Sequence, residues 1–115
     1  MPMQGRYEEL LRRLAVHDER VLGSVLAMPI ACDVNSGLGT KTQAAVRLAG
    51  CVATQAAPQS YEWSVSAYLD AGATLEDVVG VLIALAPVIG IARVNRAAAD
   101  IASALGIDVV LPGCE

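Results

Sequence analysis

The sequence predicts an all-α fold, a single-domain bundle of five to six helices, from three observations. Apolar residues recur at intervals of three and four positions along almost the whole chain, which is the spacing of one helix face. Alternating runs of β-branched and aromatic residues, the typical pattern of strands, are scarce. The 115 residues are enough for one hydrophobic core but not for two.

The N-terminal part, residues 1–36, is expected to form a helical hairpin followed by a loop. Four apolar residues at helical spacing indicate the first helix: Tyr7, Leu10, Leu11 and Leu14. The second helix is expected over Asp18 to Ala27 and stops at Met28, because Pro29 disfavours helical geometry in the residue before it. The stretch CDVNSGLGT is a loop by composition, since it holds Asp, Asn, Ser and two glycines.

Two further helices are expected in the middle of the chain. The first runs from Thr40, whose hydroxyl is expected to cap it, to about Thr54. Its apolar positions leave few faces for solvent, so we place it at the centre of the bundle: Ala45, Val46, Leu48, Ala49 and Val52. The next helix opens at Pro58, whose missing N–H is not needed in a first turn. It ends at Gly72, a suitable left-handed cap.

The segment TLED predicts the start of the following helix through a capping box. The Thr74 hydroxyl accepts the Asp77 amide, and the Asp77 carboxylate reaches back to the amide of Thr74. The helix continues through VVGVLIALA until Pro87 breaks or kinks it. A last helix is expected over Ile91 to Leu105, and residues 107–115 form an extended tail.

The composition predicts a homo-oligomer. Hydrophobic residues make up 55% of the chain and charged residues only 17%. A small monomer has too much surface for its volume to bury the apolar side chains of such a composition. Large exposed apolar patches usually mark interfaces. The alternative is an alanine-rich bundle that stays monomeric. Two arginines are expected to pair with acids across the interface: Arg93 and Arg96 with Glu76, Asp77 or Asp100.

Charge and hydropathy argue against several classes of partner. The net charge is −4, no segment gathers Lys and Arg into a patch, and aromatic residues are few, so nucleic acid is not an expected partner. The N-terminus carries charges at Arg6, Glu8 and Glu9 and lacks the apolar core of a signal peptide. The longest uncharged run, Val78 to Ala92, is too short for a membrane span. We therefore expect no membrane association and a cytoplasmic location.

The cysteines and the single histidine do not match a metal site. Cys32, Cys51 and Cys114 are widely spaced, no CxxC occurs, and His17 is the only histidine. No metal or other cofactor is expected. Cys51 lies in an apolar stretch and is expected to be a small core residue, whereas Cys114 is expected to be exposed. The acids beside His17 indicate a surface residue without a catalytic role.

Three blocks of the segment from Thr40 to Gly106 resemble the carboxymuconolactone decarboxylase family, which includes the alkylhydroperoxidase D-like proteins. They are KTQAAVRLAG, EWSVSAYLDAGATLEDVVGVL and APVIGIARVNRA, in the family's order and spacing. The resemblance implies an alkylhydroperoxidase D-like helical core over residues 38–106, without a cofactor. It also implies self-assembly into a homo-trimer or homo-hexamer.

The reactive residues of the family are replaced in this chain. In the hydroperoxidase branch, the two Cys positions fall on Ala57 and Ser60, the His position on Ser64 and the Glu position on Ala44. The decarboxylase branch has a Trp-His pair before the same turn. Here Trp63 matches the Trp, and Ser64 again replaces the His. Serine has no redox cycle, and it lacks the near-neutral pKa that His brings to proton transfer.

The sequence leaves a possible small-molecule site at these positions. Ser60, Ser64 and Ala67 share a helix face at spacings of four and three, and small residues leave volume there. Candidate ligand-binding residues are a cation on the preceding helix, two hydroxyls and two aromatic walls: Arg47, Ser60, Ser64, Trp63 and Tyr68. The competing interpretation is that the small residues serve close helix packing.

Four functional hypotheses therefore stay open. The first is a family protein with a degenerate site that binds or acts on a small organic molecule without thiol redox chemistry. The second is an active decarboxylase or lactonase-type enzyme that stabilises an anion with Arg47 and hydroxyls. The third is a thiol peroxidase that uses non-standard cysteines such as Cys51 and Cys32. The fourth is a purely structural assembly protein.

Overall fold

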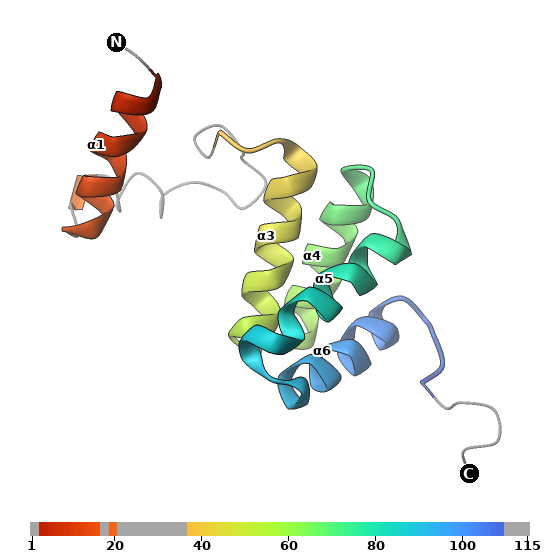
Figure 1. Cartoon of the computed structure of the whole chain (residues 1–115). Helices are drawn as coiled ribbons and strands as arrows, with labels where there is room; N and C mark the ends of the chain where they lie inside the picture. Colours follow the sequence, from red (N-terminus) through yellow and green to blue (C-terminus); the bar gives the residue numbers. More distant parts are fainter. Residues whose placement is uncertain (1–2, 17–18, 21–36, 110–115) are drawn as a thin grey trace. The chain divides into compact units, whose positions relative to one another are not determined.

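The computed structural model describes residues 3–16, 19–20 and 37–109, and all regular structure within them is helical (Figure 1). Five helices have defined bounds: α1 (Met3–Ala15), α3 (Thr40–Ala53), α4 (Pro58–Asp70), α5 (Leu75–Ile89) and α6 (Ile91–Ala104). The predicted all-α fold is confirmed. The helix expected over Asp18 to Ala27 lies mostly outside the described residues. Of its positions the structure describes only Glu19 and Arg20, and both are helical.

The chain divides into two compact units, residues 1–37 and 38–115, and each is described by itself. In the first unit, α1 follows the predicted apolar spacing. Its surface carries two ion pairs, from Arg12 and Arg13 to Glu9, at 3.2 and 3.3 Å. Exposed pairs at this spacing contribute only about 0.3–0.5 kcal/mol each. Three apolar side chains of this helix are exposed: Tyr7, Leu11 and Leu14.

The second unit is a four-helix core in which each of α3, α4, α5 and α6 contacts the other three. The side chains of Leu48 and Val52 on α3 are fully buried, as the periodicity predicted. They pack with apolar residues from each of the other three helices. These are Tyr61, Val65 and Tyr68 of α4; Val78 and Leu82 of α5; and Val94, Ala97 and Ile101 of α6. Val46 is an exception among the predicted core positions, because its side chain faces solvent.

Two helix ends form as the sequence predicted. At the start of α5, Thr74 and Asp77 make both bonds of the capping box, at 3.0 and 3.2 Å. After α4, Gly72 adopts a left-handed φ of 102°, so that its N–H donates to the Leu69 carbonyl at 3.0 Å. The next N–H, of Ala73, reaches the Tyr68 carbonyl at 3.1 Å, which completes a Schellman motif.

One other prediction about a helix end was wrong, and at Pro87, where a break or a kink was predicted, the break does not occur. Thr40 is not the cap of α3, because Gly39 occupies the N-cap position in extended geometry and makes no side-chain cap bond. Pro87 does not break α5, which continues to Ile89. Proline lacks its own N–H and so removes only one backbone hydrogen bond, and Pro87 itself is exposed. Gly90, with a φ of 94°, ends the helix instead.

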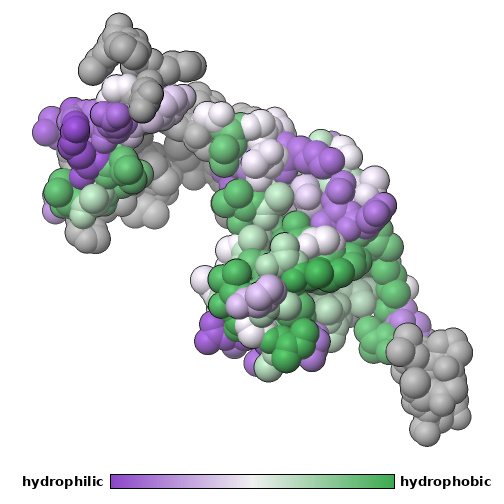
Figure 2. Space-filling model, viewed as in Figure 1, coloured by the Kyte–Doolittle hydropathy of each residue, from purple (hydrophilic) through white to green (hydrophobic). Residues whose placement is uncertain are grey.

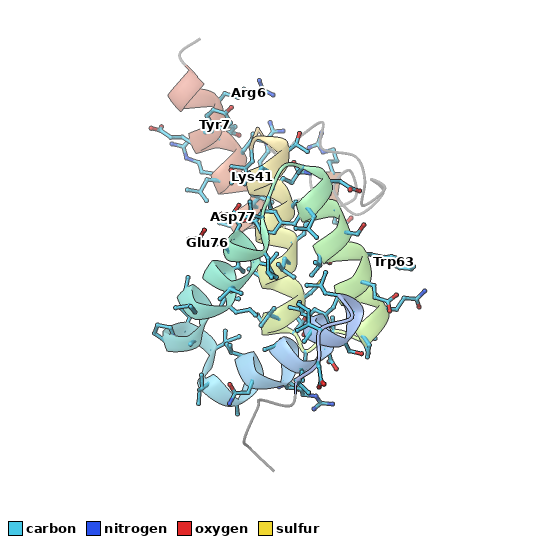
Figure 3. All side chains as sticks on the ribbon, turned by 90° about the vertical axis from the view of Figure 1, so that its right-hand side faces the viewer. Arg6, Tyr7, Lys41, Trp63, Glu76 and Asp77 are labelled. Carbon is cyan, nitrogen blue, oxygen red and sulfur yellow. The ribbon has the colours of Figure 1, made fainter. Side chains whose placement is uncertain are left out.

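The N-termini of α3 and α5 are joined by an ion pair. Lys41 Nζ lies 3.2 Å from the Asp77 carboxylate, and Figure 3 shows both side chains where the two helices begin. Asp77 was expected to find a partner across a subunit interface, whereas its partner here is a lysine of the same chain. Within the described residues, no helix is long and apolar enough to cross a membrane.

Candidate functional site

The helices α3 and α4 bring Cys51 and Ser64 into contact. Only residues 54–57 separate the two helices, so they pack as an antiparallel pair. In this register the Cys51 sulfur and the Ser64 hydroxyl oxygen lie 3.2 Å apart, within hydrogen-bond reach for a sulfur atom. Both side chains are half-buried. The position on which the family histidine falls therefore faces the preceding helix and keeps some access to solvent.

Tyr61 holds the main chain behind this contact. Its side chain is buried, and its hydroxyl donates to the Cys51 carbonyl at 3.2 Å. Burial raises the pKa of Tyr61, and the charges of Asp100 and Cys51 raise it further, while the charge of Arg96 lowers it. The phenol consequently keeps its proton at neutral pH. It acts as a hydrogen-bond donor that fixes the end of α3, not as a base.

Arg47 and Ser60 lie one helical turn from the Cys51–Ser64 contact, in opposite directions along the antiparallel pair. Arg47 precedes Cys51 by one turn of α3, and Ser60 precedes Ser64 by one turn of α4, so each pair shares a helix side. Both Arg47 and Ser60 are half-buried. We call these four residues, Arg47, Cys51, Ser60 and Ser64, the α3/α4 seam. The seam supplies one cation, one thiol and two hydroxyls, a set suited to hydrogen bonding with an anion.

The other two positions matched to the family are not part of the seam. Ala44 lies in the core, with 8% of its surface exposed, and packs with the apolar residues around α3. Ala57 is the N-cap residue of α4 and is exposed at the start of that helix. A carboxylate at position 44 would sit among apolar side chains, where its charge would be costly to bury.

The two aromatic residues do not form the expected walls. Trp63 is 61% exposed, and Figure 3 shows its side chain pointing away from the bundle. Tyr68 is 6% exposed and belongs to the core. The reason is helical rotation. Residues 61, 65 and 68 define the buried side of α4, and Trp63 is turned by about 200° from Tyr61 at 3.6 residues per turn.

Sequence reasoning missed the Cys51–Ser64 contact and the role of Tyr61. The signal that could have found them is the short connection over residues 54–57, which forces α3 and α4 to pair antiparallel. Pairing outward from that connection places position 51 opposite the first turns of α4. Cys51 is half-buried at the edge of the core, so the prediction of a core residue holds only in part.

Several other predicted features do not enter this site. His17, Cys32 and Cys114 lie outside the described residues, as do residues 110–115 of the expected tail. Arg96 and Asp100 are both on α6, and their charges act on Tyr61. In the described part of the chain, no group of three or more His, Cys, Asp or Glu side chains is placed to hold a metal ion.

Comparisons of the chain with models of known protein families, with curated proteins and with solved structures found no match.

Proposed function

We propose that this chain is a member of the carboxymuconolactone decarboxylase family whose α3/α4 seam binds a small organic acid without thiol redox chemistry. The order of its helices and the ends of α4 and α5 are compatible with the three blocks that carry the resemblance. One observation carries the proposal. Ser64, at the family's histidine position, still meets the preceding helix, through its 3.2 Å contact with Cys51.

The residues of the seam favour binding over proton transfer. Arg47 offers a guanidinium that pairs with a carboxylate in bidentate geometry. The Ser60 and Ser64 hydroxyls donate to the remaining oxygens of the ligand and need no ionisation to do so. A hydroxyl is a poor base at neutral pH, and Tyr61 keeps its proton because its pKa is raised. The proposed ligand is an anion of small size, held by one charge and two hydroxyls.

Calorimetric titration with benzoate tests this proposal, with benzamide as the uncharged analogue of the same shape. We expect benzoate to bind and benzamide to bind at least about tenfold more weakly, which corresponds to 1.4 kcal/mol. Arg47→Met is expected to lower the affinity for benzoate by a similar factor, and Ser64→Val is expected to lower it by somewhat less. Arg12→Met, an exposed arginine of α1, is the matched control and leaves binding unchanged.

Three results would contradict the proposal. Equal affinity for benzoate and benzamide would show that the charge of the ligand's carboxylate does not contribute to binding. Unchanged benzoate binding in Arg47→Met would move the site away from the seam. Absence of binding for a panel of aromatic and aliphatic carboxylates at millimolar concentration would remove the acid-binding function itself.

The Cys51–Ser64 contact favours one second candidate, a peroxidase with a single reactive cysteine. In this chemistry the Cys51 thiolate attacks the distal oxygen of a hydroperoxide. The O–O bond breaks, an alcohol leaves after protonation, and Cys51 becomes a sulfenic acid. Two molecules of a small thiol then reduce the sulfenic acid to the thiol, releasing water and a disulfide.

Hydroperoxide consumption with dithiothreitol separates the two candidates. The first proposal predicts no turnover above the uncatalysed rate. The second predicts turnover that Cys51→Ser abolishes and that Cys32→Ser and Cys114→Ser leave intact. Turnover that survives all three substitutions together would exclude thiol chemistry.

A further inference from the structure

The outer face of α5, turned away from the core, is apolar and exposed. It comprises Glu76, Val79, Gly80, Ile83, Ala84 and Pro87, with Leu75 and Val88 at its edges. Ile83 is 67% exposed and Val88 is 78% exposed. Glu76 is the only charged residue of this face. Figure 2 shows apolar atoms gathered over α5 and its turn into α6.

The composition of α5 is typical of a helix that other protein surfaces cover on all sides. From Val78 to Ile89 it has no charged or polar side chain, and a helix that is apolar all round is normally buried. Its inner side already packs in the core through Val78 and Leu82. The outer side therefore has the chemistry of an interior surface, although the core of the second unit leaves it exposed.

Gly80 on this face is not required by the chain's own packing. A Cβ atom built on Gly80 meets no atom within 4 Å, and its backbone is ordinary helix. Glycine in the middle of a helix is nevertheless unfavourable relative to alanine. A close approach by another helix is a reason for a glycine at such a position.

We infer that the outer face of α5 binds a second copy of this chain, with the two α5 helices antiparallel about a two-fold axis. A two-fold axis between Gly80 and Ile83 places the Ile83 side chain of each copy against Gly80 of the other. The face is thus complementary to itself, as an isologous interface requires. The inference rests on α5 alone and is independent of the α3/α4 seam.

The charges at the two ends of α5 also fit this arrangement. Glu76 lies in the first turn of α5, and Arg93 is exposed in the first turn of α6, just after α5 ends. Antiparallel packing brings Glu76 of one copy towards Arg93 of the other, twice by symmetry. The pair covers the exposed face of α5 in both copies, and a specific interface has to bury at least about 1,000 Å² in total.

Sedimentation velocity of the full chain over a concentration series tests the inference. We expect the wild-type chain to dimerise, and Ile83→Asp to weaken dimerisation at least about a hundredfold, because it buries a charge against an apolar surface. Val46→Asp is the matched control, since Val46 is an exposed apolar residue of α3. It leaves dimerisation unchanged. Circular dichroism verifies that each variant is helical.

Two further variants keep the test decisive if Ile83→Asp does not fold. Gly80→Leu fills the space needed for close approach, at a position where a Cβ atom meets nothing of its own chain within 4 Å, and it is expected to weaken dimerisation about tenfold or more. Arg93→Glu weakens dimerisation by charge repulsion, and adding Glu76→Arg restores it. Restoration in the double variant supports a contact between the two residues in the dimer.

Two outcomes would overturn the inference. One is a wild-type chain that stays monomeric at about 100 µM, which would place the dissociation constant of the proposed dimer well above that concentration. The other is dimerisation that neither Ile83→Asp nor Gly80→Leu weakens, which would locate the interface on another surface. A larger assembly that Ile83→Asp reduces to smaller species supports α5 as one of its interfaces.

Discussion

The helices α3 and α5 reach stability by different routes. The N-cap of α3 is a glycine that makes no side-chain bond, and the helix is held by Leu48 and Val52, which are fully buried. The start of α5 has both bonds of a capping box, and the helix ends at Gly90, but its outer face is apolar and exposed. Tertiary packing thus secures α3, whereas local hydrogen bonds mark the limits of α5.

This difference separates two uses of an apolar helix. On α3 the large apolar residues Leu48 and Val52 pack in the core of the same chain. Arg47 and Cys51, the residues that α3 contributes to the seam, are half-buried beside them. On α5 the apolar residues exceed what the core of one chain covers. Most helical stability in proteins comes from packing of an apolar face, so substitutions in α3 should have larger effects than substitutions at the ends of α5.

The largest expected effect comes from a cavity at the centre of α3. Leu48→Ala should lower the free energy of unfolding by about 2–5 kcal/mol, because the surrounding helices cannot close fully over the lost methyl groups. Urea denaturation followed by circular dichroism measures the loss. Val46→Ala, on the exposed side of the same helix, should change stability by less than about 0.5 kcal/mol. Similar losses in both variants would mean that Leu48 is not more tightly packed than the exposed Val46.

The next effect concerns two glycines, Gly90 at the end of α5 and Gly50 near the end of α3. Gly90→Ala should destabilise by about 1–3 kcal/mol, because a φ of 94° with a ψ of 148° is essentially restricted to glycine. Gly50→Ala, in the last turn of α3, should stabilise by up to about 1 kcal/mol, since its Cβ meets no atom within 4 Å. Thermal denaturation distinguishes the opposite signs. A neutral Gly90→Ala would show that the α5–α6 turn has an alternative geometry.

A smaller effect is expected from the cap of α5. Thr74→Ala removes the acceptor for the Asp77 amide and should cost about 1 kcal/mol. Thr74→Ser keeps the oxygen and should recover most of that loss, which separates the cap bond from loss of the methyl group. Chemical denaturation of the two variants beside the wild type gives the comparison. An equal loss in both would assign the effect to packing instead.

The smallest effect is a pH dependence of the link between α3 and α5. The backbone bond from Thr74, together with the bond from Lys41, holds the pKa of Asp77 below its usual value of 3.8. The ionised form is therefore favoured in the folded state. Its stabilisation is present above the unfolded pKa and is lost as the pH falls from about 4 through the lower folded pKa. Acid titration of the unfolding midpoint should show a decrease that is smaller in Lys41→Met and smaller still in Asp77→Asn, which lacks the contribution of this carboxylate.

The sequence by itself determined most of the helix ends. The capping box of Thr74 and Asp77, the first turn at Pro58 and the left-handed Gly72 were all predicted correctly, because each depends on atoms within about one turn of the chain. Where local signals were ambiguous the predictions were wrong. Thr40 had a suitable hydroxyl, but Gly39 occupies the cap.

The tertiary structure alone decided which side chains meet. Pro58 and Gly72 identified the limits of α4, yet they did not show that Tyr61 is buried while Trp63, two residues later, is exposed. Nor did they place Ser64 beside Cys51. Such contacts depend on the register and rotation of one helix against another. Those quantities are set by how several apolar faces pack at once, and no short stretch of sequence contains that information.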